Sequence, residues 1–184
     1  PSGDIANVES WDGSSWTEIA DVNQARIAMG QATSIAGNSL GLLFGGGPGA
    51  KDETESWNGT SWTELNNLNT GRRYLSGFGL STSALGFGGE TATAGNVNVV
   101  ESWNGTSWSE VAEVNTGRQG GSAAGDSNTL GIYFGGGSNL LTEAWNGTAW
   151  TEVNDLAAAK NEGSGSGTSN AAFVVLGTVT EEWT

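Results

Sequence analysis

Four acidic residues of this 184-residue chain each precede a basic residue by eight positions. The pairs are Glu18 with Arg26, Glu64 with Arg72, Glu110 with Arg118, and Glu152 with Lys160. A ring of acid–base pairs around an axis could bind a charged ligand. Because the spacing recurs without change, we interpret the pairs as structural ion pairs between a loop and a strand.

The composition lacks two residue types on which catalysis and metal binding most often depend. The chain has no histidine and no cysteine, which removes the commonest general base and the thiolate nucleophile. A zinc or copper site would have to be built from oxygen ligands alone. Calcium-binding loops of the EF-hand type or of the aspartate-rich nonapeptide type do not occur in the sequence. We therefore predict no enzymatic activity, no metal and no cofactor.

The charge balance also restricts the partners. The formal net charge is −14 and no block of basic residues occurs. We expect neither nucleic acid nor an anionic membrane surface as a partner, because their phosphates would repel such a chain. No apolar run approaches the ~18 residues of a membrane span, and the N-terminal residues do not resemble a signal peptide.

A repeat that starts with Glu-Ser-Trp-Asn-Gly-Thr-Ser-Trp organises the whole sequence. Copies start at Glu9, Glu55, Glu101 and Glu143, and a fifth beginning starts at Glu181. Within a copy the second tryptophan always follows the first by five residues, and the basic residue follows ten residues later. Almost all variation in length lies in one connection per copy. A fixed frame with one variable connection is how a scaffold carries specificity on one face.

Each copy predicts four short antiparallel strands. Asn-Gly is a strong hairpin signal, so Trp57 and Trp62 flank a turn and share one face of a hairpin, as direct or as diagonal neighbours. We interpret the Asn-Gly-Thr triplets at Asn58, Asn104 and Asn146, and Asp12-Gly13, as such turns. Glycine makes up 31 residues and tryptophan nine, which suits many turns around a bulky core rather than disorder. Four-stranded units of about 40 residues with glycine and tryptophan signatures are typical of β-propeller blades.

An Arg that opens the first strand, a Gly-Gly that closes the second and a Trp on the outer strands resemble the kelch motif. The Trp-Asn-Gly-Thr-Ser-Trp-Thr-Glu copies are similar to repeats of marine bacteriophage tail-fibre proteins. The resemblance covers essentially the whole chain and implies a propeller, with a virion-associated or extracellular location. The last copy departs from the motif, because Lys160 replaces the Arg and Gly177-Thr178 replaces the glycine pair.

We predict one all-β domain over residues 1–184, a four-bladed propeller of four-stranded antiparallel blades. Blades span residues 21–66, 67–112 and 113–154, and residues 155–184 with 1–20 complete a fourth. The N- and C-terminal strands would then close the ring by sharing one blade, which leaves no exposed sheet edge. Two copies of the third strand compete for one place in this blade. A monomer is favoured, and two chains that form an eight-bladed ring are the alternative.

The structural core of the repeat is predicted to consist of its tryptophans and arginines, namely Trp11, Trp16, Trp57, Trp62, Trp103, Trp108, Trp145, Trp150, Arg26, Arg72 and Arg118. Ligand-binding groups are instead expected in the three variable connections, after Phe44, Phe87 and Phe134. Their polar side chains are Lys51, Asp52, Glu53, Glu90, Asn96, Asn98 and Asn139. The competing interpretation is that these loops are solvated connections only.

Two functions follow as expectations. The first is a receptor-binding or adhesive module that recognises a surface glycan or protein, because tryptophan, Asn, Asp and Glu suit stacking on sugars and bonding to hydroxyl groups. The alternative is a structural spacer or assembly module of a tail fibre or other surface protein, with no ligand of its own. Exposure of the tryptophans discriminates between the two.

Overall fold

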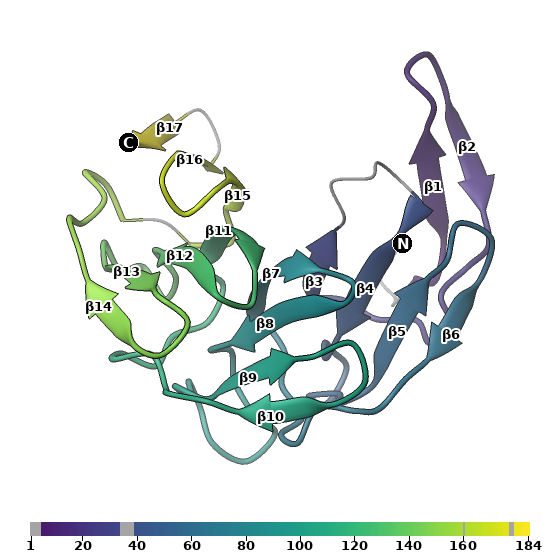
Figure 1. Cartoon of the computed structure of the whole chain (residues 1–184), viewed down its shortest axis with the longest axis horizontal. Helices are drawn as coiled ribbons and strands as arrows, with labels where there is room; N and C mark the ends of the chain where they lie inside the picture. Colours follow the sequence, from purple (N-terminus) through teal and green to yellow (C-terminus); the bar gives the residue numbers. More distant parts are fainter. Residues whose placement is uncertain (1–4, 34–38, 160, 177–178) are drawn as a thin grey trace.

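The computed structural model describes residues 5–33, 39–159, 161–176 and 179–184. In these ranges the regular structure consists of β-strands, and none of the described residues forms a helix that is long and apolar enough to cross a membrane. The predicted fold class is confirmed: antiparallel sheets are arranged as a four-bladed β-propeller. Figure 1 shows the sheets arranged around their innermost strands.

Three blades are complete and have the same strand order, with each strand paired to the next along the chain. The first contains β3 (Gly30–Thr33), β4 (Gly41–Phe44), β5 (Thr54–Trp57) and β6 (Trp62–Glu64). The second contains β7 (Ser76–Leu80), β8 (Ser83–Phe87), β9 (Val100–Trp103) and β10 (Trp108–Glu110). The third contains β11 (Ser122–Ser127), β12 (Leu130–Phe134), β13 (Thr142–Trp145) and β14 (Trp150–Glu152).

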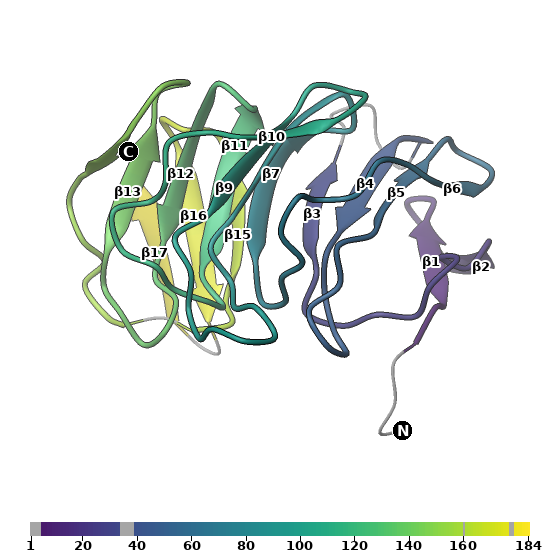
Figure 2. The ribbon, with the colours of Figure 1, turned by 90° about the horizontal axis from the view of Figure 1, so that it is seen from below.

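The two ends of the chain form smaller sheets. The fourth blade has three strands, β15 (Ser164–Gly167), β16 (Ala172–Leu176) and β17 (Val179–Trp183). The N-terminal strands β1 (Val8–Trp11) and β2 (Trp16–Ile19) form a separate two-stranded sheet, and within the described ranges no other strand pairs with them. Both views place this hairpin beside β5 and β6 and far from β17 (Figure 1, Figure 2).

The expected sharing of one blade by the two termini is therefore wrong in its strand pairing. Trp183 of β17 pairs with Ala172. In a blade shared by the two termini, Trp11 of β1 would have to pair with Ala172 instead. β17 follows β16 closely in sequence, and a short connection costs less loop-closure entropy than recruiting β1 from the other end of the chain.

The third and fourth strands of each complete blade are joined by the same turn. The side-chain oxygen of Asn58 accepts hydrogen bonds from the backbone N–H groups of Thr60 and Ser61, both at 2.9 Å. Gly59 takes a positive φ of 94° there. Trp57 and Trp62 are direct partners across the ladder, so the turn is the four-residue form. Asp12 occupies the same position in the β1–β2 hairpin, and backbone hydrogen bonds from Ser15 and Ser14 lower its pKa to about 2.

The innermost strands are poor in side chains because neighbouring blades press against them. A Cβ atom on Gly77 of β7 would lie 2.4 Å from Cζ of Phe44, which belongs to the preceding blade. On Gly125 of β11 it would lie 2.6 Å from Cδ2 of Phe78, again on the preceding blade. Because these residues have no side chain, aromatic rings can pack between the blades at these positions.

A buried ion pair connects each described arginine of the repeat to a glutamate on the third strand of the same blade. Arg72 contacts Glu101 at 3.0 Å with both side chains fully buried, and Arg26–Glu55 and Arg118–Glu143 are equivalent. Burial lowers the pKa of Arg72, and Glu101 opposes that shift. The expected pairing with the glutamate eight residues earlier is wrong. The correct glutamate lies 29 residues later in the first two copies. Lys160, expected in the fourth pair, lies outside the described residues.

Candidate functional site

Four backbone segments meet at one end of the propeller, just before the innermost strands. The second residue after the basic residue is Ala28, Tyr74, Gly120 and Glu162 in the four copies. Their φ angles are 52°, 53°, 63° and 54°, all in the left-handed region. The copies therefore share one uncommon backbone conformation here, although the side chains differ.

Hydrogen bonds connect these segments from blade to blade. The N–H of Tyr74 donates to the carbonyl of Ala28 at 2.7 Å. Gly120 donates to Tyr74 at 2.9 Å, and Glu162 donates to Gly120 at 2.7 Å. We call the four residues Ala28, Tyr74, Gly120 and Glu162 the mouth ring. Because each link joins two blades, the mouth ring fixes the positions of the side chains that it carries.

A hollow of about 480 Å³ opens at the mouth ring. Ile27, Met29 and Leu75 supply apolar walls, Tyr74 supplies an aromatic ring, and Glu162 supplies a carboxylate. Ile27 is 46% exposed, so an apolar surface is open to a ligand. Deeper between the innermost strands the space narrows to hollows of about 170 and 130 Å³, lined mostly by glycine, serine and alanine.

The variable connections predicted to carry the binding groups lie around the mouth ring. Gly47 and Ile27 exchange two backbone hydrogen bonds, at 2.8 and 3.3 Å. Arg73 and Glu90 exchange two more, at 3.0 and 2.9 Å, and Gly137 donates to Gln119 at 2.9 Å. We call this end of the propeller, formed by the mouth ring and residues 45–53, 88–99 and 135–141, the loop face.

Three of the predicted binding residues lie near the mouth ring. Glu90 accepts a hydrogen bond from Nε of Arg73 at 2.6 Å, and the guanidinium of Arg73 lies 5.6 Å from the ring centre of Tyr74. Asn96 forms a β-bridge with Glu90. The amides of Asn96 and Asn139 both approach Gly137, within 4 Å of where its Cβ would stand.

The other predicted residues are directed elsewhere. Nζ of Lys51 donates to the side chain of Gln24 at 3.2 Å, and Asn98 donates to Glu113 at 2.7 Å. Asp52 and Glu53 use their backbone carbonyls to accept hydrogen bonds from Leu68 and Gly45. These four residues fasten the connections to the blades.

Sequence reasoning missed the residues that line the hollow, namely Ile27, Met29, Tyr74, Leu75 and Glu162. A signal for them was present, because each follows the basic residue of its copy by one to three positions while its type changes between copies. In the part of the chain that the structure describes, no group of three or more Asp or Glu residues could hold a metal ion.

Comparison with known protein families and with characterised proteins finds no match to this chain. The resemblance to kelch and tail-fibre repeats stays a prediction. The geometry of the loop face has to carry the functional argument.

Proposed function

We propose that the chain is a non-catalytic binding module whose loop face receives a surface glycan or a protein receptor. The observation that carries the proposal is the mouth ring with its hollow. Four copies supply one backbone conformation and four different residues at the same place. A constant backbone with variable side chains is how a repeat scaffold builds specificity.

The left-handed backbone of the mouth ring supports this proposal. A left-handed conformation costs roughly 1–2 kcal/mol per non-glycine residue. Glycine would remove that cost, yet only Gly120 uses it, while Ala28, Tyr74 and Glu162 carry side chains at φ values above 50°. Strain of this kind concentrates at functional sites. We infer that the side chains of Tyr74 and Glu162 are kept because they contact a ligand.

The chemistry of the hollow favours a neutral, hydroxyl-rich ligand. Its volume of about 480 Å³ lies within the common range of ligand pockets, roughly 300–1,000 Å³. A tyrosine ring offers a surface on which a sugar ring stacks. Glu162 in the hollow offers acceptors for hydroxyl groups, and Glu90, Asn96 and Asn139 on the neighbouring connections add further acceptors and donors. The net charge of −14 disfavours acidic ligands.

A glycan array probed with the wild-type chain and with Tyr74→Gly tests the proposal. Glycine accepts the left-handed backbone, so this variant is expected to keep its fold while losing at least tenfold in binding. Thr148→Ala, in the turn 146–149 at the opposite end of the blade, is the matched control and is expected to bind like the wild type. A wild-type array without reproducible binding would overturn the glycan as the ligand and leave the protein receptor, and full binding by Tyr74→Gly would overturn the mouth ring as the binding site.

A second candidate function is assembly, and a different observation favours it. In the complete blades Trp57, Trp103, Trp108, Trp145 and Trp150 are at most 7% exposed and Trp62 is half-buried, whereas Trp11 and Trp16 are 47% and 65% exposed. The two exposed tryptophans were expected in the core. Their exposure coincides with the unfinished ends of the propeller, which are the places where another chain would join.

A further inference from the structure

Among the described residues, the fourth blade has no counterpart of the outermost strand of the other three. In the complete blades the outermost strand, β6, β10 or β14, begins at a tryptophan and pairs with the third strand. β17 is the third strand of its blade, and in the described residues no strand pairs with its outer edge. Such an edge presents unpaired backbone groups that can accept a further strand.

The tryptophan of the outermost strand joins its blade to the preceding one. The ring centres of Trp108 and Phe44 lie 4.8 Å apart, and Nε1 of Trp108 donates to Oγ1 of Thr54 at 3.0 Å. Trp150 makes the same ring contact with Phe87, with ring centres 5.2 Å apart, but its buried Nε1 has no hydrogen-bond partner. Each of these tryptophans therefore needs an aromatic ring on the blade before it.

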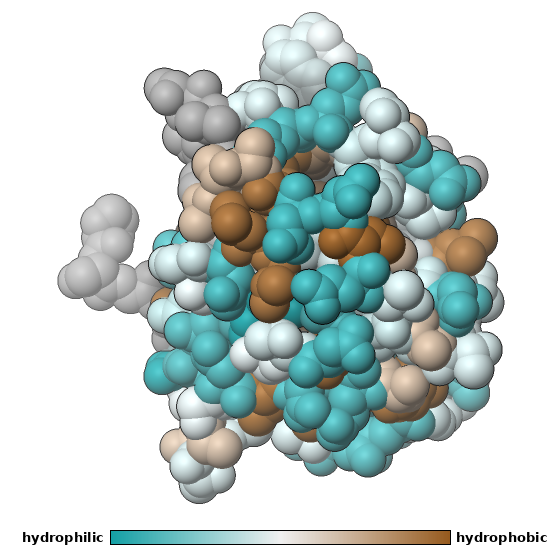
Figure 3. Space-filling view, turned by 90° about the vertical axis from the view of Figure 1, so that its left-hand side faces the viewer, coloured by the Kyte–Doolittle hydropathy of each residue, from teal (hydrophilic) through white to brown (hydrophobic). Residues whose placement is uncertain are grey.

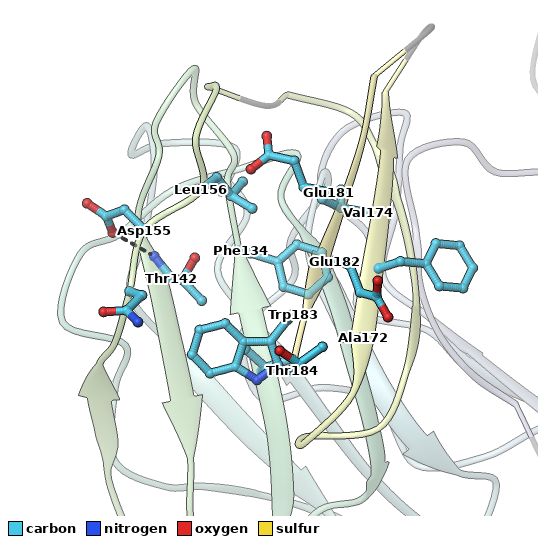
Figure 4. Close-up of a pocket in the computed structure, with 13 residues that line it drawn as sticks. Phe134, Thr142, Asp155, Leu156, Ala172, Val174, Glu181, Glu182, Trp183 and Thr184 are labelled. Atoms are coloured by element: carbon cyan, nitrogen blue, oxygen red, sulfur yellow. Dashed lines mark hydrogen bonds between the residues drawn. The ribbon is translucent and has the colours of Figure 1, made fainter.

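Beside β17 lies a cavity of about 240 Å³ with the same surroundings but no tryptophan (Figure 4). Phe134 and Thr142 are paired across β12 and β13 as Phe44 and Thr54 are paired across β4 and β5. Both line the cavity, as does Trp183, which stands where Trp103 stands in the second blade. The cavity thus corresponds to the place that the tryptophan of the outermost strand takes in the second and third blades.

A buried hydroxyl group marks the same place. Thr142 is 2% exposed, and its Oγ1 atom is buried without a hydrogen-bond partner. The equivalent atom of Thr54 accepts the indole N–H of Trp108. Buried polar atoms are rarely left unpaired, so Thr142 indicates that a donor is absent from this cavity.

β16 also carries exposed apolar side chains on the face opposite to Ala172 and Val174, which line the cavity. Phe173 and Val175 are 46% and 37% exposed. Their register equivalents on β8 are Leu85 and Phe87, which are fully buried. The space-filling view from the side of β13, β14 and β17 shows apolar side chains gathered at the surface among polar ones (Figure 3). A further blade would cover Phe173 and Val175 as the existing blades cover their equivalents.

The chain itself carries a strand with the required chemistry. β2 begins at Trp16, and the sequence Trp-Thr-Glu is shared with β6 and β14. Trp16 is the most exposed tryptophan, at 65%. β2 lies next to the blade β3–β6, where Nε1 of Trp62 donates to the carbonyl of Ala20 at 3.1 Å. A second chain that supplies β2 therefore also places its blade β3–β6 next to that strand.

We propose that β2 of a second copy of this chain leaves β1 and adds to β17 as the missing fourth strand. In the register of the complete blades, Trp16 lies opposite Trp183 and Thr17 lies opposite Glu182. The indole of Trp16 enters the cavity, stacks on Phe134 and donates its N–H to Thr142. The blade β3–β6 of the second copy then covers Phe173 and Val175.

A second copy fits better than the chain's own β2. The hairpin of the same chain lies at the opposite end of the row of blades in both ribbon views (Figure 1, Figure 2). A second copy can keep its contact between Ala20 and Trp62, and it supplies the strand and the covering blade together. Its contact is heterologous, so it produces either a closed ring or a longer chain of copies. The proposal is independent of ligand binding at the loop face.

Cysteine crosslinking tests the register directly, because the chain has no cysteine. Thr17→Cys and Glu182→Cys are made in separate chains, mixed and oxidised. A product of twice the 18.8 kDa chain mass is expected from the mixture. Thr148→Cys replaces Thr17→Cys in the control mixture and is expected to give at most a tenth of that product. Equal yield from the control, or no product from the test mixture, would overturn the proposal.

Sedimentation equilibrium of the uncrosslinked protein supplies a second measurement. The wild-type mass is expected to rise with concentration, at raised salt to screen the negative charge, and Trp16→Ala is expected to stay at the mass of one chain. Trp11→Ala tests whether an exposed indole causes non-specific association, and this variant is expected to associate like the wild type. Thr142→Val is expected to weaken association about tenfold, while Thr54→Val leaves it unchanged. A wild type that is monomeric at every concentration, with Trp16 buried by its own chain, would overturn the proposal.

Discussion

The interface between the first and second blades and the open face of the fourth blade are built from equivalent residues, yet they differ in burial. At the complete interface Phe44 meets Trp108, and both side chains are at most 5% exposed. At the open face of the fourth blade Val175, the register equivalent of Phe44, is 37% exposed, and in the N-terminal hairpin Trp16, the counterpart of Trp108, is 65% exposed. The repeat sequence thus does not determine burial on its own. A neighbouring blade is needed to turn the same side chain into core.

The comparison also separates two kinds of contact. The buried ion pair forms within one blade. It joins the arginine that precedes the innermost strand to a glutamate on the third strand. The tryptophan contact forms between blades. A blade can therefore satisfy its charges alone but needs a neighbour to bury its tryptophans, as in other repeat proteins whose stability depends on adjacent units.

The largest expected effect comes from breaking a buried ion pair in the complete part. Glu101→Gln leaves the fully buried guanidinium of Arg72 without its counter-charge. Removing one partner of such a pair costs about 3–5 kcal/mol, so the free energy of unfolding measured in urea should fall by about that amount. Glu110→Gln, on the exposed side of β10, is the control and should change it by less than about 0.5 kcal/mol. Equal effects of the two variants would contradict the assigned pairing.

The tryptophans give a similar contrast between closed and open regions. Trp108→Ala removes a 5% exposed indole and its hydrogen bond to Thr54, so a loss of about 3–5 kcal/mol is expected in the free energy of unfolding. Trp16→Ala, measured in dilute solution where copies stay apart, should cost less than about 0.5 kcal/mol because this indole is already in water. A large loss for Trp16→Ala in the dilute protein would mean that the hairpin packs within its own chain.

Much of the frame could be predicted because it depends on local chemistry. Asn-Gly turns, tryptophans at fixed spacing and glycine-rich innermost strands each impose local structure, and together they predicted the antiparallel blades. The burial of Arg26, Arg72 and Arg118 also followed from their fixed place in the repeat.

The remaining features depend on contacts that spacing does not encode. The partner of Arg72 is Glu101, which reaches it only after the whole blade has folded. The mouth ring arises because four segments from different copies meet, and no single copy shows that Tyr74 and Glu162 share a hollow. The competition between β1 and β17 was visible in the sequence. Its outcome depends on chain connectivity, which decided in favour of β17.

The smallest expected effect concerns Tyr133, which is packed between the second and third blades. Its hydroxyl donates to the carbonyl of Arg118 at 3.1 Å, and burial raises the pKa of Tyr133 from 10.0 to about 12. The neutral phenol is thus favoured in the folded state. Its contribution to stability is fully present below pH 10 and is lost as the pH rises from 10 towards 12. Because a tenfold change in an ionisation constant corresponds to about 1.4 kcal/mol, the loss amounts to roughly 2–3 kcal/mol.

Urea unfolding followed below pH 10 and again between pH 10 and 12 measures this loss. The variant Tyr133→Phe is expected to be less sensitive to alkali than the wild type, because it has no phenol to ionise on unfolding. Tyr74→Phe, at the open mouth ring, removes the other tyrosine hydroxyl and should leave the alkaline loss due to Tyr133 in place. If Tyr133→Phe loses stability with rising pH as steeply as the wild type, the burial of Tyr133 between blades is not what resists its ionisation. In that case the closed interface is more open to water than its packing indicates.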